Sequence, residues 1–132
     1  MKILIQTIIL LFLSTNIALS QSSKTFVRHL DIQTEYANVD FPAEIIIKDN
    51  KSGNFLITLE VNSNVSQSTL DNLTKSNRYL IVTEVVDGIT FIRMPKLIHT
   101  VKIGSNVISE TIKCEINLPE NIKIKKITPT LN

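Results

Sequence analysis

The sequence predicts an all-β domain of mainly antiparallel strands with one short helix near residues 66–75, arranged as a β-solenoid or as a two-layer β-sandwich. Three observations predict this class. Apolar and polar residues alternate along much of the chain, which is the period of a half-buried strand. Isoleucine and valine, which favour strands, occupy many of the apolar positions. Residues that favour turns separate the alternating segments.

Two segments alternate most regularly, and each predicts a strand with one face in the core and one face in solvent. The apolar positions are Phe55, Ile57, Leu59 and Val61 in the first segment and Ile112, Cys114, Ile116 and Leu118 in the second. The residues between them are polar, with the exception of Leu56. These two strands are expected to supply much of the core.

Two further segments, residues 44–48 and 79–86, are apolar on both faces. Strands of this kind usually lie between two layers or in the centre of a sheet, so we predict covered positions for both. The second segment is followed by Asp87 and Gly88, which link it to another apolar run. An Asp-Gly link predicts a type I′ hairpin, because both central residues need positive φ.

One helix is predicted over residues 66–75. Ser68 and Asp71 approximate a capping box, and Leu70 and Leu73 provide an apolar stripe. A helix this short is marginally stable alone. We therefore expect it to cover one end of the sheet.

Three prolines stand in related surroundings. Pro42 and Pro119 are followed at the same spacing by an Ile-x-Ile pattern, and Pro95 has a looser version of it. Proline cannot donate to a strand ladder, so each is predicted to mark a corner or edge where a strand begins. A recurrence of this kind is compatible with the turns of a β-solenoid that carries one helical insertion.

Residues 1–20 have the pattern of a secretory signal peptide. A lysine precedes an apolar run, and the small residues Ala18 and Ser20 precede a predicted cleavage after Ser20. The apolar run is shorter than the roughly 20 residues that a membrane-spanning helix needs. We expect residues 21–132 to be exported as one β-rich domain without a transmembrane span, to the periplasm, the cell surface or the medium.

The charges of the exported part are nearly balanced, because residues 1–20 hold only one of the 14 basic residues and none of the 12 acidic ones. A nucleic-acid surface needs clustered cations, so no nucleic-acid partner is expected. Lys123 and Lys125 lie close together, yet they alternate with Ile122 and Ile124. This alternation indicates that the two lysines lie on the solvent-exposed face of a strand.

Cys114 is the single cysteine, and it has one candidate chemical partner. If residues 96–103 and 108–118 form a hairpin with aligned apolar faces, Leu97 lies opposite Cys114 and His99 lies diagonal to it. A catalytic Cys–His couple would also need a group that orients the imidazole and an oxyanion loop, and the sequence shows neither.

Core packing is therefore the predicted role of Cys114, with an intermolecular disulfide, redox use and catalysis as the alternatives. His99 is expected to be half-buried. His29, His99 and Cys114 have no carboxylates at metal-ligand spacing, so we expect no metal and no cofactor, and we assign no catalytic residue.

Leu56, Ile92 and Ile98 fall on the otherwise polar faces of their predicted strands. Together they form a candidate contact surface, since exposed apolar patches often bind partners. The alternative is that a second layer covers them. Long apolar strands also invite self-association through sheet edges.

Residues 38–48, 54–64 and 76–82 resemble the opening of exported domains of Bacteroidetes in the auto-transporter adhesin head (GIN) group. The shared pattern is an apolar strand, a strand that ends in Glu60-Val61-Asn62, a short helix, and a strand introduced by an asparagine. The resemblance covers residues 38–86. Phe41-Pro42 replaces the glycines that the family has near its first strand.

The resemblance implies an exported, adhesin-like β-domain, related to cell-surface proteins whose strands coil as a solenoid, with no catalytic residue to transfer. We therefore expect a non-enzymatic binding or scaffold module of the bacterial envelope, with an unidentified protein or surface polymer as its partner. The alternative is a small periplasmic enzyme, or an enzyme inhibitor, that uses the region of His99 and Cys114.

Overall fold

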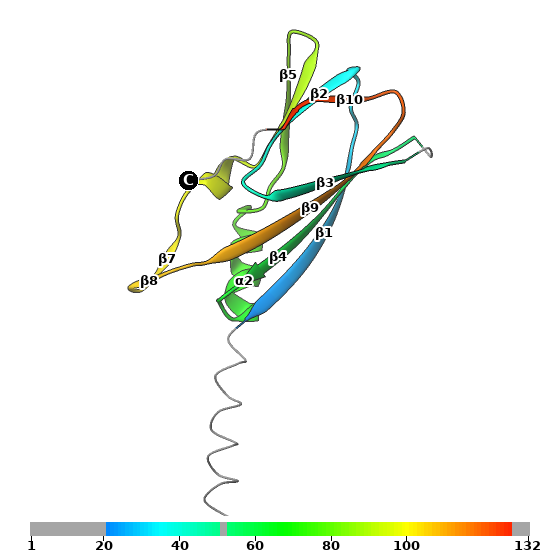
Figure 1. Cartoon of the computed structure of the whole chain (residues 1–132). Helices are drawn as coiled ribbons and strands as arrows, with labels where there is room; N and C mark the ends of the chain where they lie inside the picture. The colour runs from blue at the N-terminus through cyan, green and yellow to red at the C-terminus, as the bar shows by residue number, and fades with distance from the viewer. Residues whose placement is uncertain (1–20, 51–52, 128–132) are drawn as a thin grey trace, which may run out of the picture.

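The structure is a computed structural model that describes residues 21–50 and 53–127 (Figure 1). These residues contain two four-stranded sheets, a small two-stranded hairpin and one α-helix. The predicted signal peptide, residues 1–20, lies outside the described residues. The predicted all-β class with one short helix is confirmed, in the form of two layers, and the described residues form no solenoid.

The first sheet has the strand order β1-β4-β9-β3. Its strands are β1 (Ser22–Leu30), β4 (Phe55–Ser63), β9 (Glu110–Leu118) and β3 (Glu44–Asp49). β4 pairs antiparallel with β1 and with β9, whereas β3 runs parallel to β9. β9 thus lies between β3 and β4, although β3 and β4 are consecutive in the chain.

The second sheet has the strand order β10-β2-β6-β5. Its strands are β10 (Lys123–Ile127), β2 (Tyr36–Asp40), β6 (Ile89–Arg93) and β5 (Val82–Val86). β2 runs parallel to both of its neighbours, and β5 and β6 form an antiparallel hairpin. Asp87 and Gly88 have φ values of 51° and 76° in its turn, which confirms the predicted type I′ link.

The apolar faces of both sheets contribute to one core. The two regular alternations predict this face correctly, because Ile57 and Leu59 on β4 and Cys114 and Ile116 on β9 are buried. The lysine-rich segment 122–126 also alternates as predicted, with Ile122 buried and the lysines exposed.

On β6 the predicted faces are reversed. Thr90 and Ile92 point into the core, and Phe91 lies on the outer face. A threonine can be buried there because its hydroxyl pairs with the hydroxyl of Thr34, 2.6 Å away. The sequence pattern counts threonine as polar and therefore assigns this face to solvent.

The two segments that are apolar on both faces do not take central positions. β3 and β5 are the last strands of their sheets, and Ile46, Ile47 and Val85 are exposed. The prediction of central positions for these two segments is therefore wrong. Apolar residues on both faces of a strand do not indicate whether other strands lie on both of its sides in the sheet.

The helix α2 (Gln67–Lys75) confirms the predicted helix, but its cap differs from the prediction. The N-cap is Ser66, whose hydroxyl accepts a hydrogen bond of 3.2 Å from the backbone N–H of Thr69. Asp71, the expected capping-box residue, instead accepts a hydrogen bond from Lys24 of β1. Leu70 is fully buried, and α2 packs against β1.

Two of the three prolines mark strand starts as predicted. Pro42 precedes β3 and Pro119 precedes β10. Pro95 instead begins a short 3-10 helix, η2 (Pro95–Ile98), where its missing N–H and fixed φ are tolerated. The long hairpin predicted over residues 96–118 is therefore wrong, because β9 pairs with β3 and β4, and the short hairpin before it is formed by β7 (Lys102–Ile103) and β8 (Asn106–Val107).

Candidate functional site

The segment of residues 95–108, between β6 and β9, extends away from the sandwich and ends in the β7–β8 hairpin (Figure 1). Gly104 has a φ of 62° in the turn, a conformation that glycine adopts without strain. Ile98, Ile103 and Val107 are each about half exposed. Three large apolar side chains are thus presented on one short projecting segment.

Hollows of the surface flank this segment. One of about 320 Å³ is lined by Leu97, His99 and Val101 on the segment and by Glu110 of β9. A second hollow, of about 340 Å³, lies on the side of α2, where Ile103 and Val107 face Ser66 and Thr69. The segment is therefore bordered by concave surface, the shape that small-molecule sites usually have.

A buried ion pair holds the base of the segment in place. Arg78, which follows α2, donates from Nε to both carboxylate oxygens of Glu110, at 3.1 and 3.2 Å, and Nη2 adds a third contact. Both side chains are only 9% exposed. Tyr79 donates its hydroxyl hydrogen to the same carboxylate. We call these three residues the Arg78 clamp.

The Arg78 clamp also reaches the backbone of the projecting segment. Nη1 of Arg78 donates to the carbonyl oxygens of Lys96 and His99, at 3.3 and 3.0 Å. One guanidinium thereby connects the 3-10 helix, the end of α2 and the first residue of β9. The backbone around residues 96–99 is fixed by these bonds.

The electrostatics of the Arg78 clamp suit a structural role. Burial by itself would lower the pKa of Arg78, but the adjacent Glu110 carboxylate outweighs it and raises that pKa. Burial and the neighbouring Glu110 raise the pKa of Tyr79, so its hydroxyl stays protonated and keeps donating. Both oxygens of Glu110 are occupied by these donors, which leaves the carboxylate poorly placed to accept a substrate proton.

The predicted hairpin places His99 diagonal to Cys114, but the structure does not bring these two residues together. Cys114 lies opposite Leu59 of β4 and Ile45 of β3, and it is almost fully buried. Burial raises the pKa of its thiol to about 12. The predicted packing of Cys114 in the core is confirmed.

His99 is exposed rather than half-buried, because the residues before it coil as η2 instead of pairing with β9. Its backbone is tied through Arg78 to Glu110, four residues from Cys114 along β9. Four strand residues span about 13 Å, so the imidazole lacks the contact with the thiol that the predicted hairpin required.

The three residues of the predicted contact surface occupy separate places. Leu56 is partly buried on the outer face of the first sheet, opposite His29 and Asn117. Ile92 is fully buried in the core and reaches no surface. Ile98 is exposed on the projecting segment, and it alone of the three lines the same hollow as Val107.

The sequence interpretation missed Arg78, Glu110 and Tyr79. Arg78 and Glu110 are separated by 32 residues, so no local pattern couples them. The exposed Ile103 and Val107 were also missed, because the longer predicted hairpin places Ile103 on its apolar face and Val107 in its closing loop, residues 104–107.

Within residues 21–50 and 53–127 there is no group of three or more His, Cys, Asp or Glu side chains placed to hold a metal ion. No helix in the same residues has both the length and the apolar character needed to cross a membrane. Comparisons of the chain with protein-family models, with curated proteins and with solved structures found no match.

Proposed function

We propose that this chain is an exported, non-enzymatic β-domain of the bacterial cell envelope, an adhesin-like or scaffold module that binds a protein or a surface polymer through the segment of residues 95–108. The observation that carries the proposal is the presentation of Ile98, Ile103 and Val107 on a projecting segment with an anchored base. Exposed apolar side chains grouped in this way usually mark interaction sites.

The Arg78 clamp supports a binding role because it orders the base of the segment before any partner arrives. Each flexible side chain or loop that must be ordered on binding opposes association, so a held backbone favours affinity. The two carbonyl oxygens that Arg78 holds belong to Lys96 and His99, which flank the exposed Ile98. The binding surface is thus expected to be largely pre-formed.

The enzyme alternative has less support. A cysteine nucleophile needs an accessible thiol with a lowered pKa, whereas burial raises the pKa of Cys114 to about 12. His99 is exposed. Its backbone is tied through Arg78 to Glu110, which lies four residues from Cys114 along β9. An inhibitor that presents residues 95–108 to an enzyme would be one form of the proposed binding module.

Export through a cleaved signal peptide is part of the proposal and has its own test. The full-length chain, expressed in a bacterial host, is expected to accumulate outside the cytoplasm with an N-terminus at Gln21. Intact-mass measurement on the purified protein reads the cleavage site directly. A chain that keeps residues 1–20 in the cytoplasm would overturn the export proposal without affecting the binding surface.

Site-specific photo-crosslinking tests the binding surface. A photoreactive amino acid is placed at position 98, 103 or 107, and at position 27 as a control, because Val27 is equally exposed on the outer face of β1. In cells that make the protein naturally, crosslinked products are expected from the first three positions and not from the control. Equal crosslinking at all four positions, or none at the first three, would overturn the proposal.

A further inference from the structure

The free edge of β3 presents apolar side chains to solvent. Within residues 21–50 and 53–127, β3 pairs with β9 alone, so its other side carries backbone N–H and C=O groups without a neighbouring strand. Ile46 is 50% exposed on the outer face, and Ile47, on the core side, is 37% exposed. Ile47 also lines a hollow of about 530 Å³ between β3 and residues 118–124.

The sequence of β3 is complementary to itself when two copies run antiparallel. With Ile46 at the centre, Glu44 of one copy lies opposite Lys48 of the other, and the same pair repeats on the far side of the axis. The intervening Ile45 lies opposite Ile47. Within residues 44–48, every cross-strand pair is therefore either apolar or of opposite charge, which is the combination that stabilises antiparallel neighbours.

The faces of the sheet agree with this pairing. Ile45 lies opposite the buried Cys114, so Ile45 and Ile47 point to the core side, and Glu44, Ile46 and Lys48 point outward. In the proposed register each residue meets a residue of its own face. A shift of the register by two residues would instead place Glu44 opposite Ile46 of the other copy in one direction, and Lys48 opposite Ile46 in the other direction.

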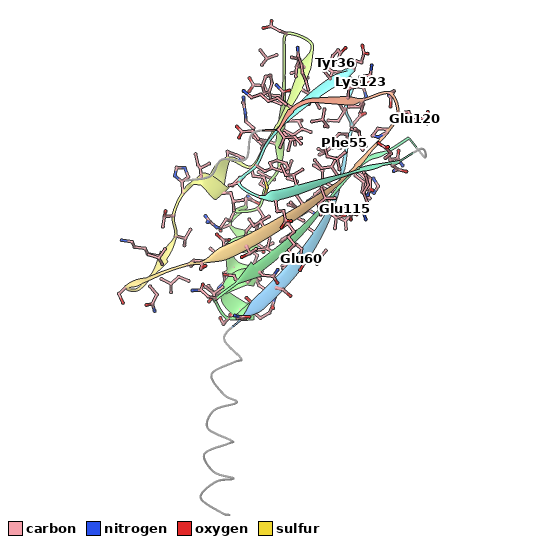
Figure 2. The ribbon with its side chains drawn as sticks, in the orientation of Figure 1. Tyr36, Phe55, Glu60, Glu115, Glu120 and Lys123 are labelled. Carbon is pink, nitrogen blue, oxygen red and sulfur yellow. The ribbon has the colours of Figure 1, made fainter. Side chains whose placement is uncertain are left out.

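The charge pattern of the outer face continues across the proposed junction. Glu60 on β4 lies opposite Lys113 on β9, and Lys113 lies opposite Glu44 on β3. Lys48 of the second copy would be next in this row, so the signs alternate through four strands. Lys48 already forms an ion pair with Glu115 of its own β9 (Figure 2 labels Glu60 and Glu115).

The edge of β5 has the opposite property. Val82, Val85 and Val86 are exposed there, so β5 is as apolar as β3. An antiparallel pairing that overlaps all five residues of β5 places Glu84 opposite its own equivalent. Like charges directly opposite each other are destabilising, so the charges favour pairing at β3 and oppose it at β5.

We propose that two copies of this chain associate through antiparallel pairing of their β3 strands about a two-fold axis, which joins their four-stranded sheets into one continuous sheet. The occupant of the β3 edge is thus a second copy, held by the isologous contact typical of closed dimers. This surface is separate from residues 95–108, so the inference does not depend on the proposed function. A pairing that overlaps residues 44–48 of the two strands gives a small interface, so a reversible dimer is expected.

Charge reversal tests the register. The full-length chain is expressed with its own leader, purified in the form that the cell produces, and examined by analytical ultracentrifugation over concentrations that reach about 1 mM, as a small interface requires. The wild type is expected to form dimers as the concentration rises. Glu44→Lys or Lys48→Glu alone should weaken the dimer by about tenfold or more, because each change turns two attractive cross-strand pairs into repulsive ones.

An equimolar mixture of the two variants supplies the decisive measurement. Positions 44 and 48 are then both positive in one chain and both negative in the other, so the mixed dimer is complementary and association should return. Loss of folding cannot produce this rescue. Val85→Lys, at the other apolar edge, is the matched control and should leave the wild-type dimer unchanged.

Several results would overturn the proposal. They are a wild type that stays monomeric at the highest concentration, a mixture that associates no better than the single variants, and a dimer that Val85→Lys abolishes. Assemblies that grow beyond dimers would also contradict it, because they require a head-to-tail contact that does not close.

Discussion

The guanidinium of Arg78 bridges both carboxylate oxygens of Glu110, and this contact joins the end of α2 to the first residue of β9. Both side chains are buried, whereas the other ion pairs that the structure shows lie at least partly in solvent. A buried pair of this kind leaves a costly uncompensated charge when one partner is removed. It is therefore the polar contact whose loss the fold should tolerate least.

Replacement of Arg78 tests this directly. Arg78→Met should lower the free energy of unfolding by about 3 kcal/mol, because the carboxylate of Glu110 stays buried and loses its cation. Arg93→Met is the matched control, since the ion pair of Arg93 with Glu84 is largely exposed and should contribute less than about 1 kcal/mol. Urea denaturation of both variants measures the difference. Equal losses would contradict the structural role of the Arg78 clamp.

The thiol of Cys114 predicts a stability that falls at alkaline pH. Burial raises its pKa from 9.0 to about 12, so above pH 9 the unfolded chain releases a proton that the folded chain keeps. The stabilisation is present below pH 9 and is lost as the pH rises toward 12, with a slope of at most about 1.4 kcal/mol per pH unit.

Comparison with Cys114→Ala isolates this contribution. The alanine variant lacks the thiol, while Tyr79, whose pKa is also raised, titrates in both proteins and cancels in the difference. The gap between the unfolding free energies of the two proteins should therefore change between pH 9 and pH 11. A constant gap would show that the thiol titrates alike in the folded and unfolded chains. A disulfide reagent should label Cys114 only after unfolding.

The three residues of the predicted contact surface should respond differently to the same substitution. Ile98→Asp places a charge in solvent and should shift the melting temperature by less than about 3 °C, whereas Ile92→Asp buries a charge and should cost more than about 4 kcal/mol. Leu56→Asp should fall between them, because Leu56 is partly buried. Thermal denaturation ranks the variants, and a severe loss for Ile98→Asp would show that position 98 is covered.

The turn between β5 and β6 offers a test of backbone strain alone. Gly88 has a φ of 76°, and a Cβ added there meets no atom within 4 Å, so Gly88→Ala creates no clash. The left-handed conformation should nevertheless cost about 1 kcal/mol. Asp87→Asn is the control, because asparagine also tolerates positive φ. Chemical denaturation that shows no difference between the two variants would argue against the type I′ turn.

Much of the local structure was predictable from the sequence. The alternation in residues 55–61 and 112–118 identified two core strands and the burial of Cys114, and Asp87 with Gly88 identified a hairpin. Such features depend on residues that are neighbours in the chain. Alternation reports which side of a strand avoids water, and a turn depends on the φ values that two residues allow.

The tertiary structure alone decided the lateral order of the strands and the contents of the candidate site. The two segments that are apolar on both faces form the edge strands β3 and β5. His99 is separated from Cys114, and Arg78 is buried against the carboxylate of Glu110, 32 residues away in the chain. The physical reason is that these properties depend on contacts between distant parts of the chain. The alternation of apolar and polar residues indicates which side chains are buried. It does not indicate which strand, which charged group or which second copy of the chain lies beside them.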